Sequence, residues 1–187
     1  MSGLIAVFLG VAAAVAAQDA VTLEQASSRS GRDMSPAYEG RTVWIRAQVA
    51  TAPVWALGTY YLPVRDSSDH ALLIRGDRER FAGLDPGDWI ECQGTIQSVA
   101  AMPLLTPAQI RQLRGDAAPE PKELTIGDLS GFRYLGLLVR TTATVTSASE
   151  NLGGKSFEIS DHGNTISVFL PRRPGDASAA RLPGSRR

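Results

Sequence analysis

The feature that most constrains this chain is the alternation of apolar and polar residues between positions 41 and 51. Every second side chain in this segment is apolar, and the side chains between them carry polar or charged groups or, in one case, an indole ring. One set is Val43, Ile45, Ala47 and Val49, and the other is Trp44, Arg46 and Gln48. A period of two is that of an extended strand with one buried face, so the segment predicts a half-buried β-strand.

The segments that follow predict four more strands and a short helix. Strands are expected at 59–65, 70–74 and 89–96, and one or two helical turns at 77–84. The last segment, 104–113, is either a strand throughout or a strand with a short helix. Turn residues separate them at 66–69 and at Pro86-Gly87-Asp88. Five strands with a helix after the third form the pattern of an OB barrel.

We therefore predict a mainly β fold with an OB-type five-stranded barrel at residues 40–114. Its expected core is Val43, Ile45, Leu62, Val64, Leu73, Ile90 and Ile96.

The barrel pattern then begins a second time. Residues 115–135 have the composition of a linker, with a short helix near 126–129. Gly40, Val43, Ala47 and Val49 recur 96 residues later as Gly136, Val139, Ala143 and Val145. Leu62, Val64 and Asp66, and then Ala71 and Leu73, recur 95 residues later. Repeats at a fixed spacing are structural units, although amphipathic strands resemble one another. No fourth strand follows, so we expect a partial second OB-like unit at 136–171 and a disordered tail at 172–187.

The first residues predict export from the cytoplasm. The run from Leu4 to Ala17 is almost entirely apolar, is too short to anchor a protein in a bilayer, and ends in small residues before Gln18. We interpret residues 1–17 as a signal peptide and 18–39 as a leader segment of the barrel. No Lys or Arg precedes the apolar run, and the alternative is a buried N-terminal helix. The expected location is periplasmic, or more generally extracytoplasmic.

Recognisable catalytic patterns are absent from the sequence. The stretch Ser149 to Ser156 lacks the first glycine of a phosphate-binding loop, and a strand pattern follows it in place of a helix, so we interpret it as a hairpin loop. His70 and His162 lie in turns without the ligand spacing of a metal site. Cys92 alternates with apolar residues and is expected to be buried. We therefore expect a protein that is not an enzyme and that has no cofactor and no metal.

Charge and aromatic residues bear on the ligand. Lys plus Arg and Asp plus Glu both number 19, which disfavours nucleic acid as the main partner because such proteins carry a basic excess. Trp44 lies on the polar face of its strand, and Trp55, Tyr60 and Tyr61 follow it. Flat rings beside a cation suit sugars and anions alike, which makes Trp44, Tyr61 and Arg65 the candidate ligand-binding residues. The alternative is that these rings only cover the barrel.

A family resemblance adds to this interpretation. Residues 40–49, the Tyr60-to-Asp66 strand, the Leu84-to-Gly94 segment and the strand ending at Asp161 resemble the extracytoplasmic sensor region of bacterial sensor histidine kinases, which carries tandem OB-like domains. The likeness covers about residues 20–170. It implies an input module of a two-component system, truncated here, whose full-length relatives lie in the inner membrane and reach it through a downstream segment. The kinase domains of that family have no counterpart in this chain.

Two functional hypotheses follow. The first is a non-catalytic, extracytoplasmic module that senses a ligand or signal, with a small ligand or a protein as its unidentified partner. The second is a free-standing periplasmic OB-fold protein that binds an oligosaccharide, a peptide or a nucleic acid.

Overall fold

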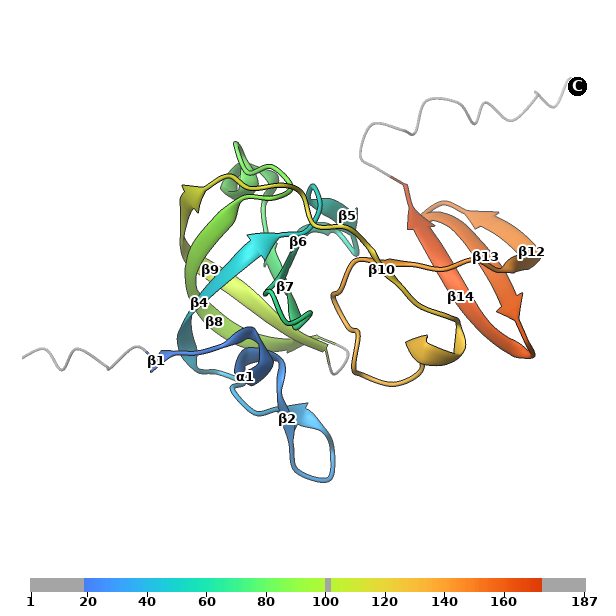
Figure 1. Cartoon of the computed structure of the whole chain (residues 1–187), viewed down its shortest axis with the longest axis horizontal. Helices are drawn as coiled ribbons and strands as arrows, with labels where there is room; N and C mark the ends of the chain where they lie inside the picture. The colour runs from blue at the N-terminus through green and yellow to red at the C-terminus, as the bar shows by residue number, and fades with distance from the viewer. Residues whose placement is uncertain (1–18, 100–101, 173–187) are drawn as a thin grey trace, which may run out of the picture.

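The computed structural model describes residues 19–99 and 102–172 (Figure 1). The expected signal peptide and almost all of the expected tail lie outside these residues. The elements of the first part are β1 (Asp19–Ala20), α1 (Leu23–Ser27), β2 (Arg29–Ser30), β3 (Ser35–Pro36), β4 (Thr42–Val49), β5 (Val54–Ala56), β6 (Thr59–Arg65), β7 (Ala71–Gly76), the 3₁₀ helix η1 (Arg78–Phe81), β8 (Trp89–Val99) and β9 (Met102–Arg114). The second part contains β10 (Lys122–Glu123), the 3₁₀ helix η2 (Gly127–Leu129), β11 (Val139–Arg140), β12 (Thr144–Asn151), β13 (Gly154–Asp161) and β14 (Asn164–Pro171).

Five strands close into a barrel. β4 pairs with β8, β8 with β9, β9 with β7, β7 with β6, and β6 again with β4. All of these pairs are antiparallel except β7–β9, which is parallel. If the five strands are numbered by their position in the chain, their order around the barrel is one, two, three, five, four, and strand four then pairs with strand one. The predicted mainly β fold with an OB-type five-stranded barrel is confirmed, and the predicted fifth strand is a strand throughout.

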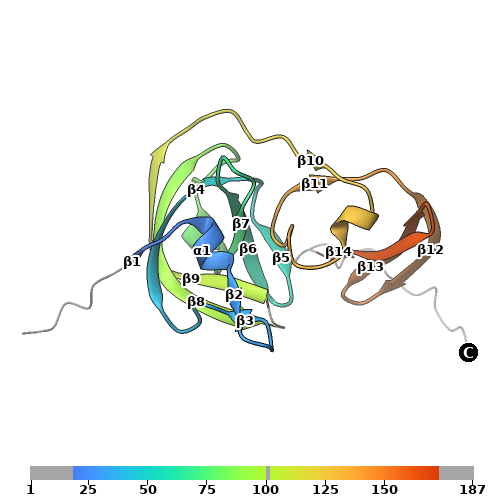
Figure 2. The ribbon, with the colours of Figure 1, turned by 60° about the horizontal axis from the view of Figure 1, so that its bottom comes forward.

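The ends of the barrel are closed by helical turns. The Thr22 side chain accepts a hydrogen bond from the backbone of Gln25, and the Gln25 side chain accepts one from the backbone of Thr22, which forms a capping box at the start of α1. Leu23 and Ala26 of this helix are part of the barrel core, and Figure 2 shows α1 lying across one end of the barrel. The predicted helical turns after the third strand form η1, and Phe81 of η1 also enters the core.

The core agrees with the prediction at six of its seven positions, and the exception is Leu73. Val43, Ile45, Leu62, Val64, Ile90 and Ile96 are buried in one cluster, but the core residues of β7 are Leu72 and Ile74. The turn decides this. The Asp66 carboxylate accepts hydrogen bonds from the backbone of Ser68 and His70, and Arg65 then pairs with Ala71. This register places Leu72 opposite Val64 and turns Leu73 outward, where it is only half-buried. Because residues 72–74 are all apolar, alternation alone could not choose the phase.

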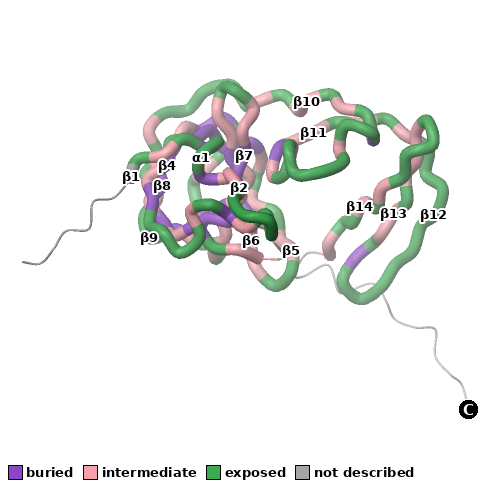
Figure 3. The backbone as a smooth tube through the Cα atoms, turned by 90° about the horizontal axis from the view of Figure 1, so that it is seen from below, coloured by how far each residue is buried: buried purple, intermediate pink, exposed green. Residues whose placement is uncertain are grey.

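The second part is an open sheet. β12, β13 and β14 form an antiparallel meander, and β10 pairs with β11 in a separate parallel ladder. Figure 3 shows that burial is concentrated in the barrel, whereas the meander is mostly exposed or intermediate. Within the described residues, no helix is long and apolar enough to cross a membrane.

Candidate functional site

The β5–β6 hairpin places two aromatic rings together at the edge of the barrel. Its turn is made by Leu57 and Gly58, both with positive φ (49° and 80°), which is the backbone conformation that a two-residue hairpin turn requires. Trp55 then pairs with Tyr60 across the strands. Their ring centroids are 5.0 Å apart with an interplanar angle of 61°, an edge-to-face contact that holds both rings in place.

These rings line an open cleft of about 680 Å³ between the hairpin and η1. We call it the hairpin cleft, and its lining residues are Ala52, Pro53, Trp55, Tyr60, Arg78, Glu79, Phe81 and Ala82. The first four come from the loop and hairpin after the first barrel strand, and the rest come from the helical turn after the third. The volume lies in the range of small-molecule sites, about 300–1,000 Å³. In comparison, the cavity beneath the linker at Arg29 and Phe132 is about 50 Å³, which is too small for such a ligand.

Three arginine side chains lie around the hairpin cleft and the depression beside it. Arg78 is exposed and Arg75 is half-buried, and among the described residues neither side chain is in an ion pair or a hydrogen bond. Arg80 donates to the carbonyl of Pro107 over 2.9 Å. Arg75 and Arg80 line an adjoining depression together with Thr59 and Asp77. Two guanidinium groups are thus available to a ligand, while Asp77 and Glu79 keep the local charge close to neutral.

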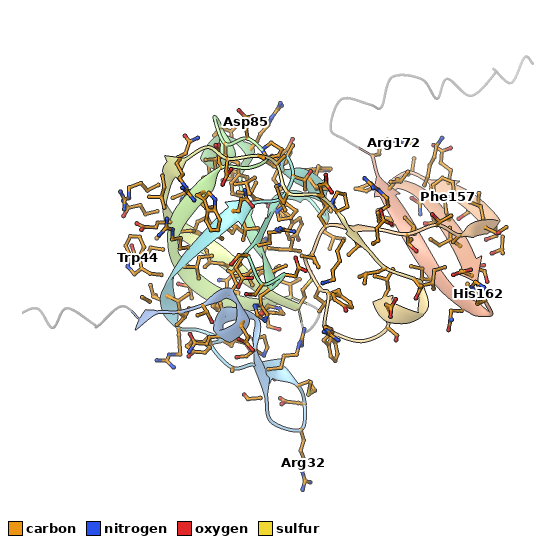
Figure 4. The ribbon with its side chains drawn as sticks, in the orientation of Figure 1. Arg32, Trp44, Asp85, Phe157, His162 and Arg172 are labelled. Atoms are coloured by element: carbon orange, nitrogen blue, oxygen red, sulfur yellow. The ribbon has the colours of Figure 1, made fainter. Side chains whose placement is uncertain are left out.

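The three ligand residues predicted from the sequence do not lie in one site. Trp44 lines a separate depression with Ala20, Val21, Ile45, Arg46 and Glu91, and Figure 4 shows it on the side of the barrel away from the β12–β14 sheet. Tyr61 is only 7% exposed. Arg65 is in an ion pair with Asp69 at 3.3 Å. Neither Tyr61 nor Arg65 lines the depression at Trp44, and the role of all three residues in ligand binding remains a prediction.

The residues that the structure brings together were visible in the sequence but carried no clear signal. Trp55 and Tyr60 flank Ala-Leu-Gly-Thr, in which Leu-Gly is a hairpin turn. The short strand β5 was not predicted from the sequence, and the position of these two rings opposite each other was therefore not predicted either. Arg78 approaches them only because η1 folds back over the hairpin, which is a tertiary contact.

Other reactive groups are held in structural contacts. His70 lies 3.1 Å from a carboxylate oxygen of Asp66, and His162 lies at the β13–β14 turn, 2.6 Å from Asp161. Burial raises the pKa of the Cys92 thiol to about 12, so the thiol is protonated at neutral pH. Within residues 19–99 and 102–172, no group of three His, Cys, Asp or Glu side chains could hold a metal ion. Residues 149–156 form the β12–β13 hairpin, which confirms that interpretation of the stretch.

No family model matches the chain, and no curated protein matches it. Several solved structures are similar at low identity. The hypothetical protein YgiW from E. coli is 19% identical, with a TM-score of 0.38, over 52% of this chain and 94% of that one. The S. pombe Stn1–Ten1 complex is 22% identical, with a TM-score of 0.35, over 39% and 58%. A putative aspartyl-tRNA synthetase from Leishmania major Friedlin is 15% identical, with a TM-score of 0.40, over 64% and 25%. The assignment of the fold therefore rests on the strand pairing of the barrel itself.

Proposed function

We propose that this chain is a binding module that takes its ligand in the hairpin cleft. The observation that carries the proposal is the fixed Trp55–Tyr60 pair beside Arg78 in an open cleft of about 680 Å³. OB barrels bind ligands on their second and third strands and on the loop between the first and second. In this barrel those elements are β6, β7 and the loop that contains β5. The site thus lies where the architecture ordinarily presents one.

The cleft favours an oligosaccharide as the ligand. A sugar ring stacks its apolar face on an aromatic side chain, and Trp55 and Tyr60 offer two such surfaces. Arg78 and Glu79 at the rim can donate to and accept from hydroxyl groups. Nucleic acid is less favoured because the whole chain has no basic excess. The module then acts through binding, without catalysis of its own.

We further propose that the module works outside the cytoplasm, as the input part of a sensor. This rests on the signal-like residues 1–17 and on the resemblance to sensor regions. Sensing requires that the ligand bind two conformations of the module unequally. N-terminal sequencing of exported protein is expected to begin near Gln18, and a cytoplasmic product that retains Met1 would contradict this proposal.

Ligand screening with tryptophan fluorescence and thermal shift tests the cleft. Neutral and uronate-containing oligosaccharides serve as probes, with single-stranded DNA as the comparison. We expect an oligosaccharide to bind, and Trp55→Ala to weaken that binding about two- to twelvefold, since one stacked ring is worth roughly 0.5–1.5 kcal/mol.

Trp44→Ala is the matched control, because it removes the same side chain from a different depression of the same barrel. Equal binding losses for Trp44→Ala and Trp55→Ala would contradict the placement of the site. Tight, strongly salt-dependent binding of DNA would identify a nucleic-acid module instead.

A further inference from the structure

The β12–β13 hairpin repeats the pairing of β4 with β6. In the barrel, Gln48 pairs with Arg65 and Val49 with Val64. In the open sheet, Thr144 pairs with Ser160 and Val145 with Ile159. The first strand is shifted by 96 positions and the second by 95 in both pairs, so the register is conserved residue by residue, and the intervening loop is one residue shorter.

The next pair of strands is repeated in the same way. The core pairs of β6–β7 and their counterparts in β13–β14 are Leu62–Ile74 with Phe157–Val168 and Val64–Leu72 with Ile159–Ile166. The second strand is now shifted by 94 positions, because the turn at His162-Gly163 is again one residue shorter. This corrects the sequence alignment of β14, which used a spacing of 95 and so equated Ala71 and Leu73 with Ile166 and Val168. The inward positions of the barrel therefore correspond to a single apolar face of the open sheet.

The segment before the first strand is repeated as well. β1 lies parallel to β4 at Val43 and Trp44, and β10 lies parallel to β11 at Val139 and Arg140, 96 positions later. The ladders continue alike. The backbone of Val21 donates to the carbonyl of Trp44 over 2.9 Å, and that of Leu124 donates to the carbonyl of Arg140 over 3.0 Å.

The capping boxes of the two helical turns also correspond. In the turn that leads into η2, the Asp128 carboxylate accepts a hydrogen bond from the Thr125 backbone over 3.0 Å, and the Thr125 hydroxyl accepts one from the Asp128 backbone over 3.3 Å. Thr22 and Gln25 make the same two bonds in α1. The next residue is buried in each case, Leu23 at 1% and Ile126 at 2% exposure. Thus the second unit has the leader, the helical turn and three strands in the order of the first.

The difference lies in what covers the apolar face. In the barrel, β8 pairs with β4 along Thr42–Gln48, and β9 pairs with Leu73 and Ile74 of β7. Among the described residues, β11 and β12 have no such neighbour on their second edge, and neither has β14. The apolar face is consequently open: Val145 is 56% exposed, and Phe157, Ile159, Ile166 and Val168 are only partly buried.

We propose that β11–β14 is the first part of a second OB barrel and that it binds an amphipathic β-hairpin as its fourth and fifth strands. The register is defined by the first barrel. One strand of the hairpin pairs antiparallel with residues 138–144, as β8 does with 42–48, and the other pairs parallel with Ser167 and Val168, as β9 does with Leu73 and Ile74. The pairing satisfies the open edges, and alternating apolar side chains cover the exposed face.

The test adds such a hairpin to the full chain. A second copy of residues 84–114 is fused after Arg187, and amide hydrogen exchange is measured by mass spectrometry. We expect exchange in residues 138–144 and in β14 to slow at least about tenfold relative to the unmodified chain, because edge amides become paired. The control carries Ile90→Asp and Ile96→Asp in the added copy alone, and it should leave exchange unchanged.

A negative result could also arise because the side chains of the added hairpin do not fit those of β13 and β14, and a second variant removes this explanation. The substitutions Phe157→Leu, Ile159→Val, Ile166→Leu and Val168→Ile give the sheet the same inward residues as β6 and β7, so the added hairpin meets the lining for which it is built. If exchange in residues 138–144 and in β14 stays fast in this variant as well, the proposal is wrong. It is also wrong if sedimentation shows that the unmodified chain dimerises and that Phe157→Asp abolishes the dimer, because the occupant is then a second copy.

Discussion

The barrel and the β12–β14 sheet share a strand register but not a core. Val49 and Val145 occupy equivalent positions, and one is fully buried while the other is 56% exposed. The strands and turns of both units follow from local sequence, since each hairpin pairs as its own turn dictates. Burial depends instead on β8 and β9, which close the first unit and have no equivalents among the described residues of the second. The same local pattern therefore yields a stable core in one region and an exposed apolar face in the other.

The largest expected effect comes from a charge at these equivalent positions. Val49→Asp places a carboxylate in a closed core without a partner, and it should destabilise the barrel by more than about 4 kcal/mol. Val145→Asp meets water, and it should change barrel stability by less than about 0.5 kcal/mol. Urea unfolding followed by tryptophan fluorescence reports on the barrel, which contains all three tryptophans. Equal losses would mean that Val145 is covered in solution.

Two glycines offer the next comparison. A Cβ atom at Gly94 would collide with the backbone oxygen of Thr106 on β9, and one at Gly154 would collide with that of Leu170 on β14. Gly94→Ala is expected to cost the barrel about 1–3 kcal/mol through forced backbone shifts. Gly154→Ala should leave the barrel transition in place and speed amide exchange in β13 and β14 only. A lowered barrel midpoint for Gly154→Ala would show that the two units unfold together.

The capping boxes give a smaller effect. Thr22→Ala removes the cap of a helix whose Leu23 is in the core, and it should lower barrel stability by about 1 kcal/mol. Thr125→Ala removes the equivalent hydroxyl contacts with Asp128 at the start of the turn into η2, including the hydrogen bond that lowers the pKa of Asp128. Calorimetry should detect the first change and not the second. Restoration of the Thr22→Ala loss by Thr22→Ser would assign it to the hydroxyl cap.

The smallest expected effect concerns the ion pair between the linker and the barrel. Lys122 lies 2.6 Å from Asp69, and its hydrogen bond lowers the pKa of the Asp69 carboxyl. A lowered pKa stabilises the folded state above the ordinary pKa of Asp, and this contribution disappears as pH falls through the folded value. Asp69→Asn should therefore lower stability at pH 7 by less than about 1 kcal/mol, and the difference should shrink as the pH falls below the ordinary pKa of Asp. Asp77→Asn is the control. If it causes an equal pH-dependent loss of stability, the Lys122–Asp69 ion pair is not the cause of that loss.

The candidate site was less predictable than the fold. The notable aromatic residues and arginines lie in the right part of the chain, but the pairing of Trp55 with Tyr60 required the short strand β5, which is only Val54–Ala56. Three residues are too few for a periodic signal. Tyr61 looked equally suitable in sequence, and only its 7% exposure in the folded barrel separates it from Tyr60. Adjacent residues on a strand point to opposite faces, so a single position decides which ring meets the cleft.

What the sequence by itself determined was the class and order of the elements. Alternation at 41–51, turn residues at Asp66 and at Pro86-Gly87-Asp88, and the spacing of the repeat all act through neighbouring residues, and they are legible without the fold. Only the tertiary structure decided that Leu72 and not Leu73 is in the core, that η1 brings Arg78 to Trp55, and that one unit is closed while the other is open. The phase at Leu72 follows from the hydrogen bonds of the Asp66 turn, which the run of three apolar residues does not reveal. The other two outcomes depend on contacts between residues far apart in the chain, whose energy comes from burial and pairing that no local pattern contains.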